Sequence, residues 1–238
     1  MLKGTKSRQP LRTLFNELLD MVYPELCLLC EVPLSHEEKC ICHDCLYHLP
    51  KTHFTSYTDN ESASLFYGKL PFVKAMSGFR YLKESPLQTA MELLKYKGKK
   101  QLGHVLGTVA GMPLQRGGFF NDIDVLVPVP LHPNKLRKRG YNQSEWIARG
   151  ISDVSGLPID THTLIRITDN TSQTRKHVFE RWENVTTVFT LSHPSAFEHK
   201  HVLLIDDVLT SGSTLEACGQ VVLKAEGARV SFLTLAKA

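Results

Sequence analysis

The stretch from Val202 to Thr214 joins a short apolar run, two adjacent acids and a hydroxyl-rich turn, and it constrains the fold more than any other part of the chain. The apolar residues 202–205 predict a buried strand, and residues 214–226 have the spacing of an amphipathic helix. Backbone N–H groups at a helix N-terminus, together with nearby hydroxyls, form a concavity that binds phosphate. Two carboxylates beside a phosphate would repel it unless they face sugar hydroxyls or magnesium. The run therefore predicts a ribose-phosphate site rather than an ordinary acidic strand end before a capped helix.

Strand-like and helix-like segments alternate along the chain after residue 72. The pair Ser85 and Pro86 is typical of a helix start. In order, we expect one or two strands in 72–82, helices at 86–98 and 101–112, a strand at 123–129, a helix at 143–155, a strand at 201–205, a helix at 214–226 and a strand at 229–235. This alternation is typical of βαβ units, so the expected class is α/β with a mostly parallel sheet and flanking helices. Ligands bind such sheets at the carboxyl ends of the strands, which places the loops after residues 129 and 205 at one edge.

The loop after residue 129 is strongly basic. Four cations fall close together there: Lys135, Arg137, Lys138 and Arg139. Because this loop leaves a strand at the edge where we expect phosphate to bind, a diphosphate group is its expected partner, although a run of charges is usually a solvated face. Segment 166–184 is polar and without a clear period, so it is either a mobile hood over the site or an ordinary surface loop.

Five of the six cysteines fall between Cys27 and Cys45, which is not how a disulfide framework spreads through a chain. Two CxxC pairs supply four thiols at the spacing of two zinc knuckles: Cys27 and Cys30, then Cys42 and Cys45. We therefore expect a closed structural zinc site, which has no open position for water and supports folding rather than hydrolysis. Cys40, His36 and His43 lie close enough in sequence to leave the ligand set open. A redox CxxC is the competing interpretation, but neither pair is flanked by a strand and a helix.

The chain of 238 residues divides into three parts by composition. Residues 1–23 carry an amphipathic stripe that predicts a helix packed on the protein, and its mixed charges make membrane-surface binding the weaker alternative. Residues 24–55 form the zinc-binding part, which is too poor in apolar residues to fold unaided, and residues 56–238 form the α/β domain. The N-terminus lacks the apolar core of a signal peptide, and no segment reaches the roughly 20 apolar residues of a membrane span. We therefore expect a soluble, cytoplasmic protein, whose net charge of +4 permits an anionic ligand without requiring one.

The run from Val202 to Thr214 resembles the phosphoribosyl diphosphate (PRPP) motif of type I phosphoribosyltransferases. The resemblance implies that Asp206 and Asp207 hold the ribose hydroxyls as the catalytic pair, and that magnesium accompanies PRPP. The resemblance implies that nine consecutive residues bind PRPP: Asp206, Asp207, Val208, Leu209, Thr210, Ser211, Gly212, Ser213 and Thr214. The diphosphate loop would use Lys135, Arg137 and Arg139.

Further motifs are similar to those of the ComF branch of that family. They are the segments 127–133 and 139–145, Arg137, Arg166, Gln173, Arg181 and Asn184, together with the paired CxxC segment in front. The resemblance covers residues 24–236. It implies a type I phosphoribosyltransferase fold behind a small zinc-ribbon-like domain, and a family link to competence and DNA uptake.

Three functions remain open on the sequence alone. In the first, the protein transfers a phosphoribosyl group to an acceptor that no residue identifies. In the second, it binds PRPP as a sensor without turnover. In the third, it binds single-stranded DNA during natural transformation, with a helicase or another DNA-uptake protein as partner. The third interpretation draws on basic residues around Tyr96: Lys95, Lys97, Lys99 and Lys100. The same lysines also suit the solvated C-terminal end of a helix.

Overall fold

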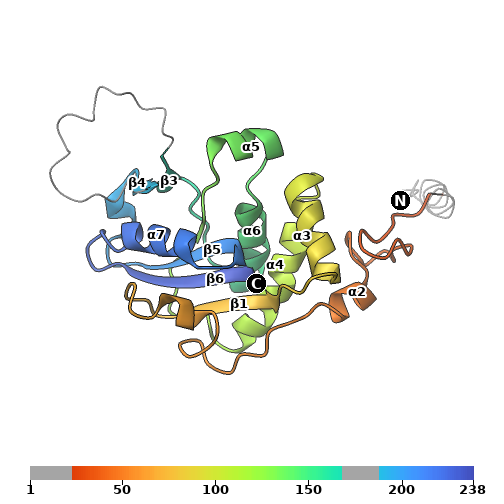
Figure 1. Cartoon of the computed structure of the whole chain (residues 1–238), viewed down its shortest axis with the longest axis horizontal. Helices are drawn as coiled ribbons and strands as arrows, with labels where there is room; N and C mark the ends of the chain where they lie inside the picture. The colour runs from red at the N-terminus through yellow and green to blue at the C-terminus, as the bar shows by residue number, and fades with distance from the viewer. Residues whose placement is uncertain (1–22, 168–187) are drawn as a thin grey trace, which may run out of the picture. The chain divides into compact units, whose positions relative to one another are not determined.

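The computed structural model describes residues 23–167 and 188–238 (Figure 1). The chain divides into two units after His48. Nearly all of the expected N-terminal helix, and the motif residues Gln173, Arg181 and Asn184, lie outside the described residues. The segment after His48 joins the larger unit, since Thr52 N donates a hydrogen bond to Gly78 O at 3.0 Å. The described part of the smaller unit is therefore residues 23–48.

The smaller unit is held by turns and one short helix. Helix α2 (His43–Tyr47) begins after Cys42, whose Sγ accepts a hydrogen bond from Cys45 N at 3.4 Å. Among the described residues of this unit, the buried apolar side chains are Ile41 and three cysteines: Cys27, Cys42 and Cys45. So small a core needs a cross-link, as the composition predicted.

The larger unit is built on a four-stranded parallel sheet, which confirms the predicted α/β class. Its strands, in spatial order, are β1 (Ala75–Arg80), β6 (Arg229–Lys237), β5 (His201–Leu209) and β2 (Val125–Pro128). Residue 128 at the end of β2 lies in register with residue 205 of β5. The loops that follow these two strands therefore leave the same edge of the sheet, as expected.

Helices cover both faces of this sheet. On one face, α7 (Ser213–Val222) packs on β5 and β6 (Figure 1), and its Leu215 shares a core cluster with Val202 and Leu204. Leu203 alternates to the opposite face, where α4 (Gln101–Arg116) and α6 (Gln143–Ser155) lie. Helix α3 (Pro86–Tyr96) packs beside α4.

Two glycines bring α4 and α6 into close contact. A Cβ added at Gly150 would lie 2.0 Å from His104 O, and one added at Gly107 would lie 2.3 Å from Ile147 O. No side chain fits between the two backbones at these points. The contact holds α6 in place, and the N-terminus of α6 carries residues of the site described below.

The structure differs from the sequence predictions at several element ends. Helix α4 continues through Pro113 to Arg116, because Leu114 is buried and its packing offsets the missing N–H of the proline. Helix α7 stops at Val222, and β5 extends through the acidic pair because β6 runs beside it to Lys237. The basic loop contains a helix, α5 (Pro133–Arg139). The remaining short elements are η1 (Ala63–Phe66), β3 (Leu164–Arg166), β4 (Phe189–Leu191), which pairs antiparallel with β3, and η2 (Pro194–Phe197).

Within residues 23–167 and 188–238, no helix has the length and apolar content needed to cross a membrane.

Candidate active site and metal centre

The acidic pair lies near the carboxyl end of β5. Asp207 is buried, whereas Asp206 is partly exposed. Asp206 Oδ1 accepts two hydrogen bonds, one from Asp207 N at 2.8 Å and one from Ser144 Oγ at 2.9 Å. Ser144 lies in the first turn of α6, so the element that follows the basic segment also holds the acidic pair.

Asp206 is an unfavourable place for a negative charge. Burial and the neighbouring Asp207 carboxylate raise the pKa of Asp206 to about 7, although the donors from Asp207 N and Ser144 favour the charged form. A cation or sugar hydroxyls at this position would favour the ionised carboxylate. Such a strained pair of carboxylates is typical of a ligand-binding site and is unusual in a contact that only stabilises the fold.

Lys95 and Gln143 are the direct partners of Asp207. Lys95 Nζ, from the last turn of α3, lies 3.1 Å from Asp207 Oδ2, and Gln143 Nε2 donates to the same oxygen at 2.8 Å. Arg139 Nη1 donates in turn to Gln143 Oε1. Sequence reasoning assigned Lys95 to a surface patch and gave Gln143 no role of its own. Only the quoted 139–145 motif could have indicated Gln143, and nothing in the sequence pairs Lys95 with residue 207.

The turn between β5 and α7 is the segment for which the sequence predicts a phosphate cradle. Gly212 has φ of +79° and, as the N-cap residue of α7, has no side chain to cap the helix. Ser213 N, at the first residue of α7, donates a long hydrogen bond of 3.5 Å to Ser211 Oγ. The Ser211 and Ser213 hydroxyls lie 2.9 Å apart, and both residues are exposed, as are Thr210 and Thr214. A small hollow is lined by Asp206, Val208, Leu209 and the whole segment 210–215. Exposed hydroxyls and backbone N–H groups at a helix N-terminus are the donors that a phosphate requires.

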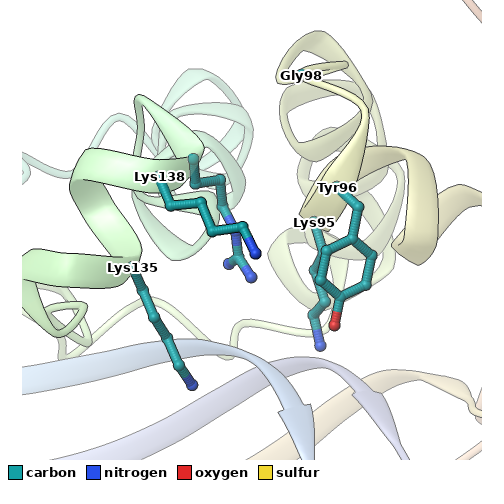
Figure 2. Close-up of a pocket in the computed structure, with 6 residues that line it drawn as sticks. Lys95, Tyr96, Gly98, Lys135 and Lys138 are labelled. Atoms are coloured by element: carbon teal, nitrogen blue, oxygen red, sulfur yellow. The ribbon is translucent and has the colours of Figure 1, made fainter.

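A basic cavity of about 580 Å³ opens beside the acidic pair. Its lining residues are Lys95, Tyr96, Gly98, Lys135, Lys138 and Arg139. Figure 2 shows the side chains of Lys95 and Tyr96 on one wall and those of Lys135 and Lys138 on the facing helix, α5. Two basic segments that are far apart in sequence thus form one cavity, and Lys95 connects it to Asp207.

The helical form of α5 decides which of its cations line the cavity. Lys135, Lys138 and Arg139 are spaced i, i+3 and i+4, so they share one face of the helix. Arg137, which we expected in the diphosphate loop, is exposed and is not among the lining residues. Lys138 was not in that predicted set, and it does line the cavity.

The four predicted metal ligands come together in the smaller unit. The Sγ atoms of Cys27, Cys30, Cys42 and Cys45 all lie within 4.8 Å of one another. Four sulfurs around a tetrahedral zinc ion, at a Zn–S distance of about 2.3 Å, are about 3.8 Å apart. The Cys30–Cys42 separation of 3.6 Å fits this geometry. The four residues therefore could hold a zinc ion.

Backbone donors favour the thiolate form of Cys27, whereas burial and the neighbouring thiols raise the pKa of Cys45. Burial would raise the pKa of the Cys27 thiol, but hydrogen bonds from Cys42 N at 3.3 Å and Leu29 N at 3.5 Å lower it to about 6. Cys40, His36 and His43 do not join the cluster, which among the described residues consists of cysteines alone. The geometry thus supports the two CxxC pairs as the ligand set that the sequence predicted.

A family model described as "Phosphoribosyl transferase domain" matches residues 123–238. The match contains β2, α5, α6, β5 and α7, and with them the acidic pair and the phosphate cradle. The chain contains a phosphoribosyl transferase domain. Together with the parallel sheet and the four-cysteine cluster in front of it, this domain confirms the fold class that the sequence resemblance implied.

Relatives extend the similarity beyond the phosphoribosyl transferase domain. The DNA utilization protein YhgH of Salmonella typhi is 24% identical over 245 residues, which is 91% of this chain and 99% of the relative. Competence protein ComFC of Bacillus subtilis is 36% identical over 112 residues, and this match covers 47% of the chain and 43% of the relative. The expected resemblance to the ComF family is confirmed by this relative.

A solved structure is similar to part of this chain. Glutamine phosphoribosylpyrophosphate amidotransferase from B. subtilis, complexed with ADP and GMP, has a TM-score of 0.40 and 19% identity. The likeness covers 61% of this chain and 30% of that protein.

Proposed function

We propose that the phosphoribosyl transferase domain binds PRPP with Mg²⁺ and transfers its 5-phosphoribosyl group to an acceptor. The observation that carries this proposal is the contiguity of three subsites at one sheet edge: the acidic pair, the hydroxyl-rich cradle at 210–214, and the basic cavity. Lys95 joins the acidic pair to the basic cavity, because it contacts Asp207 and lines the cavity. Gln143 makes a second link, since it donates to Asp207 and accepts from Arg139, which also lines the cavity. A ribose carrying a phosphate and a diphosphate needs all three kinds of subsite.

Each group then has a role that its position supports. Asp206 and Asp207 hold the ribose 2′ and 3′ hydroxyls, and the cradle holds the 5′-phosphate through backbone N–H groups and hydroxyls. Lys135 and Arg139 face the diphosphate. The acidic pair is also the carboxylate donor set that fits Mg²⁺, which would add positive charge beside the diphosphate oxygens.

The reaction needs positioning and charge stabilisation more than covalent help from the protein. A nucleophilic atom of the acceptor forms the new bond to ribose C1, while the bond from C1 to the diphosphate oxygen breaks and its electron pair leaves with diphosphate. The ribose ring gains positive character in the transition state, next to the Asp206 and Asp207 carboxylates. Lys135 and Arg139 stabilise the charge that develops on the leaving group.

Calorimetric titration of PRPP and Mg²⁺ tests this assignment. The double substitution Asp206→Asn and Asp207→Asn should abolish PRPP binding and leave the circular dichroism spectrum unchanged, whereas Glu198→Gln, an exposed carboxylate at another place, should bind normally. Affinity of the double variant within about twofold of wild type, a difference of about 0.4 kcal/mol, would overturn the ribose assignment. PRPP binding without turnover by any acceptor would instead favour a sensor.

We also propose that the four-cysteine cluster binds one structural zinc ion. The smaller unit has almost no apolar core among its described residues, so the metal would supply its folding free energy. A closed set of four thiolates leaves no coordination position for a reacting molecule.

Contact with single-stranded DNA is a second candidate function, and a DNA-uptake protein such as a helicase is a candidate partner. The relatives named above are a competence protein and a DNA utilization protein. In this chain, Lys97 and Lys99 are exposed between α3 and α4, and Lys100 Nζ lies 4.8 Å from the centre of the Trp146 ring. Exposed cations beside an aromatic ring suit a phosphate backbone with stacked bases.

A salt titration by fluorescence anisotropy tests the DNA proposal. Affinity for a labelled oligonucleotide should fall with salt at a slope of roughly −0.7 per phosphate contacted. Replacing Lys97, Lys99 and Lys100 by Ala should flatten that slope, whereas the doubly substituted 206/207 variant should keep it. Absence of binding by wild type at low salt would contradict the proposal.

A further inference from the structure

Lys95 reaches two subsites of the proposed PRPP site. Its Nζ lies 3.1 Å from Asp207 Oδ2, and the same side chain lines the basic cavity. Figure 2 shows Lys95 extending from the end of α3 toward the strands, with Lys135 doing the same from the facing wall. A lysine side chain has a flexible stem and carries its charge at the tip. Rotation of that stem can therefore move the ammonium between the acidic pair and the cavity.

The contact with Asp207 leaves part of the Lys95 ammonium unused. An ammonium has three N–H donors, and within residues 23–167 and 188–238 Asp207 is the one acid at ion-pair distance from it. The Lys95 side chain is 23% exposed, so the ammonium is not sealed in the core. None of the described residues that line the cavity is acidic. An anion that enters the cavity therefore competes with a single carboxylate for this ammonium.

Asp207 keeps a hydrogen-bond donor when Lys95 moves away. Gln143 Nε2 donates to the same Oδ2 at 2.8 Å, and Arg139 holds the other end of the Gln143 amide. Because Gln143 is buried, this donor stays in place. Without Lys95 the Asp207 carboxylate would be held but not neutralised, and it lies beside Asp206. That state is unfavourable unless ribose hydroxyls or Mg²⁺ occupy the acidic pair.

We propose that Lys95 couples the two subsites: its ammonium pairs with Asp207 in the ligand-free protein and transfers to a diphosphate oxygen when PRPP binds. The transfer is favourable when both subsites are filled, because diphosphate attracts the ammonium while the ribose replaces it at Asp207. Occupation of either subsite therefore strengthens binding at the other. This inference rests on the proposed function and adds Lys95 to the groups that face the diphosphate.

Fragments of PRPP separate the two subsites. Anhydroribitol 5-phosphate, a cyclic sugar phosphate without an anomeric oxygen, fills the acidic pair and the cradle and leaves the cavity open to diphosphate. Diphosphate with Mg²⁺ is titrated calorimetrically into the full chain, with and without a saturating concentration of this sugar phosphate. PRPP with Mg²⁺ is titrated separately. The variant is Lys95→Met, and its matched control is Lys224→Met, at an exposed lysine elsewhere.

We expect the sugar phosphate to tighten diphosphate binding by wild type about tenfold. Lys95→Met should remove this gain and weaken PRPP binding about tenfold. It should change the affinity for diphosphate alone by less than about threefold, because Asp207 still engages the wild-type ammonium in that titration. Lys224→Met should match wild type in all three titrations, and circular dichroism checks that each variant is folded.

Asp207→Asn should have the opposite effect on diphosphate. Without the carboxylate, Lys95 is released to the cavity, so diphosphate alone should bind about tenfold tighter than it does to wild type. The same substitution made in Lys95→Met should tighten diphosphate binding less than about threefold, because only the general loss of negative charge remains. This double-mutant cycle assigns the gain to the ammonium of Lys95.

Two outcomes would overturn the inference and leave the proposed function standing, provided that wild type binds PRPP. If Lys95→Met weakens diphosphate and PRPP binding by the same factor, Lys95 faces the cavity at all times and couples nothing. If Lys95→Met binds PRPP as tightly as wild type does, the contact with Asp207 serves the fold alone. Failure of wild type to bind PRPP would remove the proposed function and this inference with it.

Discussion

Asp206 is the residue at which the proposed ligand binding and the stability of the ligand-free protein conflict. Its folded-state pKa of about 7 stands well above the value of about 3.9 expected in an unfolded chain. The folded state therefore binds more protons than the unfolded state between these two values, and stability falls as pH rises through that window. Above pH 7 the full cost of the buried charge is present.

We predict that Asp206→Asn stabilises the ligand-free protein at pH 8. The amide keeps an oxygen that can accept from Ser144 and Asp207 N and removes the charge, so the unfolding free energy should rise by about 1.4 kcal/mol or more, the equivalent of one pKa unit. At about pH 4.5 the gain should be much smaller, because the wild-type carboxyl is then largely protonated in the folded state. Urea unfolding at both pH values measures the difference. Glu198→Gln serves as the control, and an Asn variant no more stable than wild type at pH 8 would contradict the prediction.

The contact between Lys95 and Asp207 shows what the sequence leaves undetermined at this scale. The acidic pair and the hydroxyl turn are contiguous, so their proximity follows from one strand and one turn. Lys95 reaches the same site from another helix, and only the packing of α3 against the rest of the unit brings it there. No local pattern encodes such a contact.

At the scale of elements, the turn before α7 depends on a glycine for two separate reasons. Gly212 has φ of +79°, and an added Cβ would lie 3.2 Å from Cε1 of Phe66, which is fully buried. Gly156 has a similar φ of +74° with nothing within 4 Å of an added Cβ. Substitution of either glycine should therefore carry the cost of a left-handed backbone, and only substitution of Gly212 should add a steric clash.

We predict that Gly212→Ala destabilises the protein more than Gly156→Ala does. The left-handed backbone should cost about 1–2 kcal/mol in either variant, and the Phe66 contact should add to the cost at Gly212 alone. Gly212→Ala should also weaken PRPP binding, since the turn presents the donors of the cradle. Thermal unfolding and calorimetry measure the two effects. Equal losses of stability in the two variants would mean that the Phe66 ring moves away from the added methyl group at no cost in free energy, and would contradict the prediction.

The two CxxC pairs bring four thiols together in the smaller unit, where we propose a zinc ion. We predict one equivalent of zinc in wild type and in Cys40→Ser, because the Cys40 sulfur is not in the cluster. Cys42→Ser should bind well below one equivalent and expose the unit to proteolysis, since structural zinc supplies folding free energy. Metal analysis and limited trypsin digestion of protein purified without chelator make the comparison. Full zinc content in Cys42→Ser would refute the four-thiolate assignment.

At the scale of the whole molecule, the order of strands and helices could be read from the sequence, whereas several element ends could not. Helix α6 has the predicted bounds because Gly156 ends it and Asn142 caps it. Helix α4 passes Pro113 because burial of Leu114 outweighs a local stop signal. The segment predicted as a basic loop is helix α5 in the structure, and the helical spacing determines which of its cations line the cavity.

The first residue of the inner strand β5, at the amino end of the sheet, is a buried histidine, His201, which affects the stability of the larger unit. His201 Nδ1 lies 2.7 Å from Asp122 O, and its Nε2 lies 2.8 Å from Ser231 Oγ. Burial lowers the pKa of His201, with further lowering from Arg229 and Lys74, although Asp122 favours the charged ring. Burial therefore favours the neutral ring in the folded sheet.

We predict that His201 makes the larger unit less stable as pH falls below about 6.5, the pKa of an unfolded histidine. In that range the unfolded chain binds more protons at this group than the folded ring does, because the folded pKa is lowered, so the unfolding free energy falls by at most about 1.4 kcal/mol per pH unit for this group. His201→Gln should be less stable at pH 8, because it loses the ring's hydrogen bonds, yet its stability should fall less steeply toward pH 5.5. His162→Gln, at an exposed position, should keep the wild-type slope. Urea unfolding between about pH 8 and 5.5 gives the slopes, and identical slopes for wild type and His201→Gln would show that the buried ring does not control this loss.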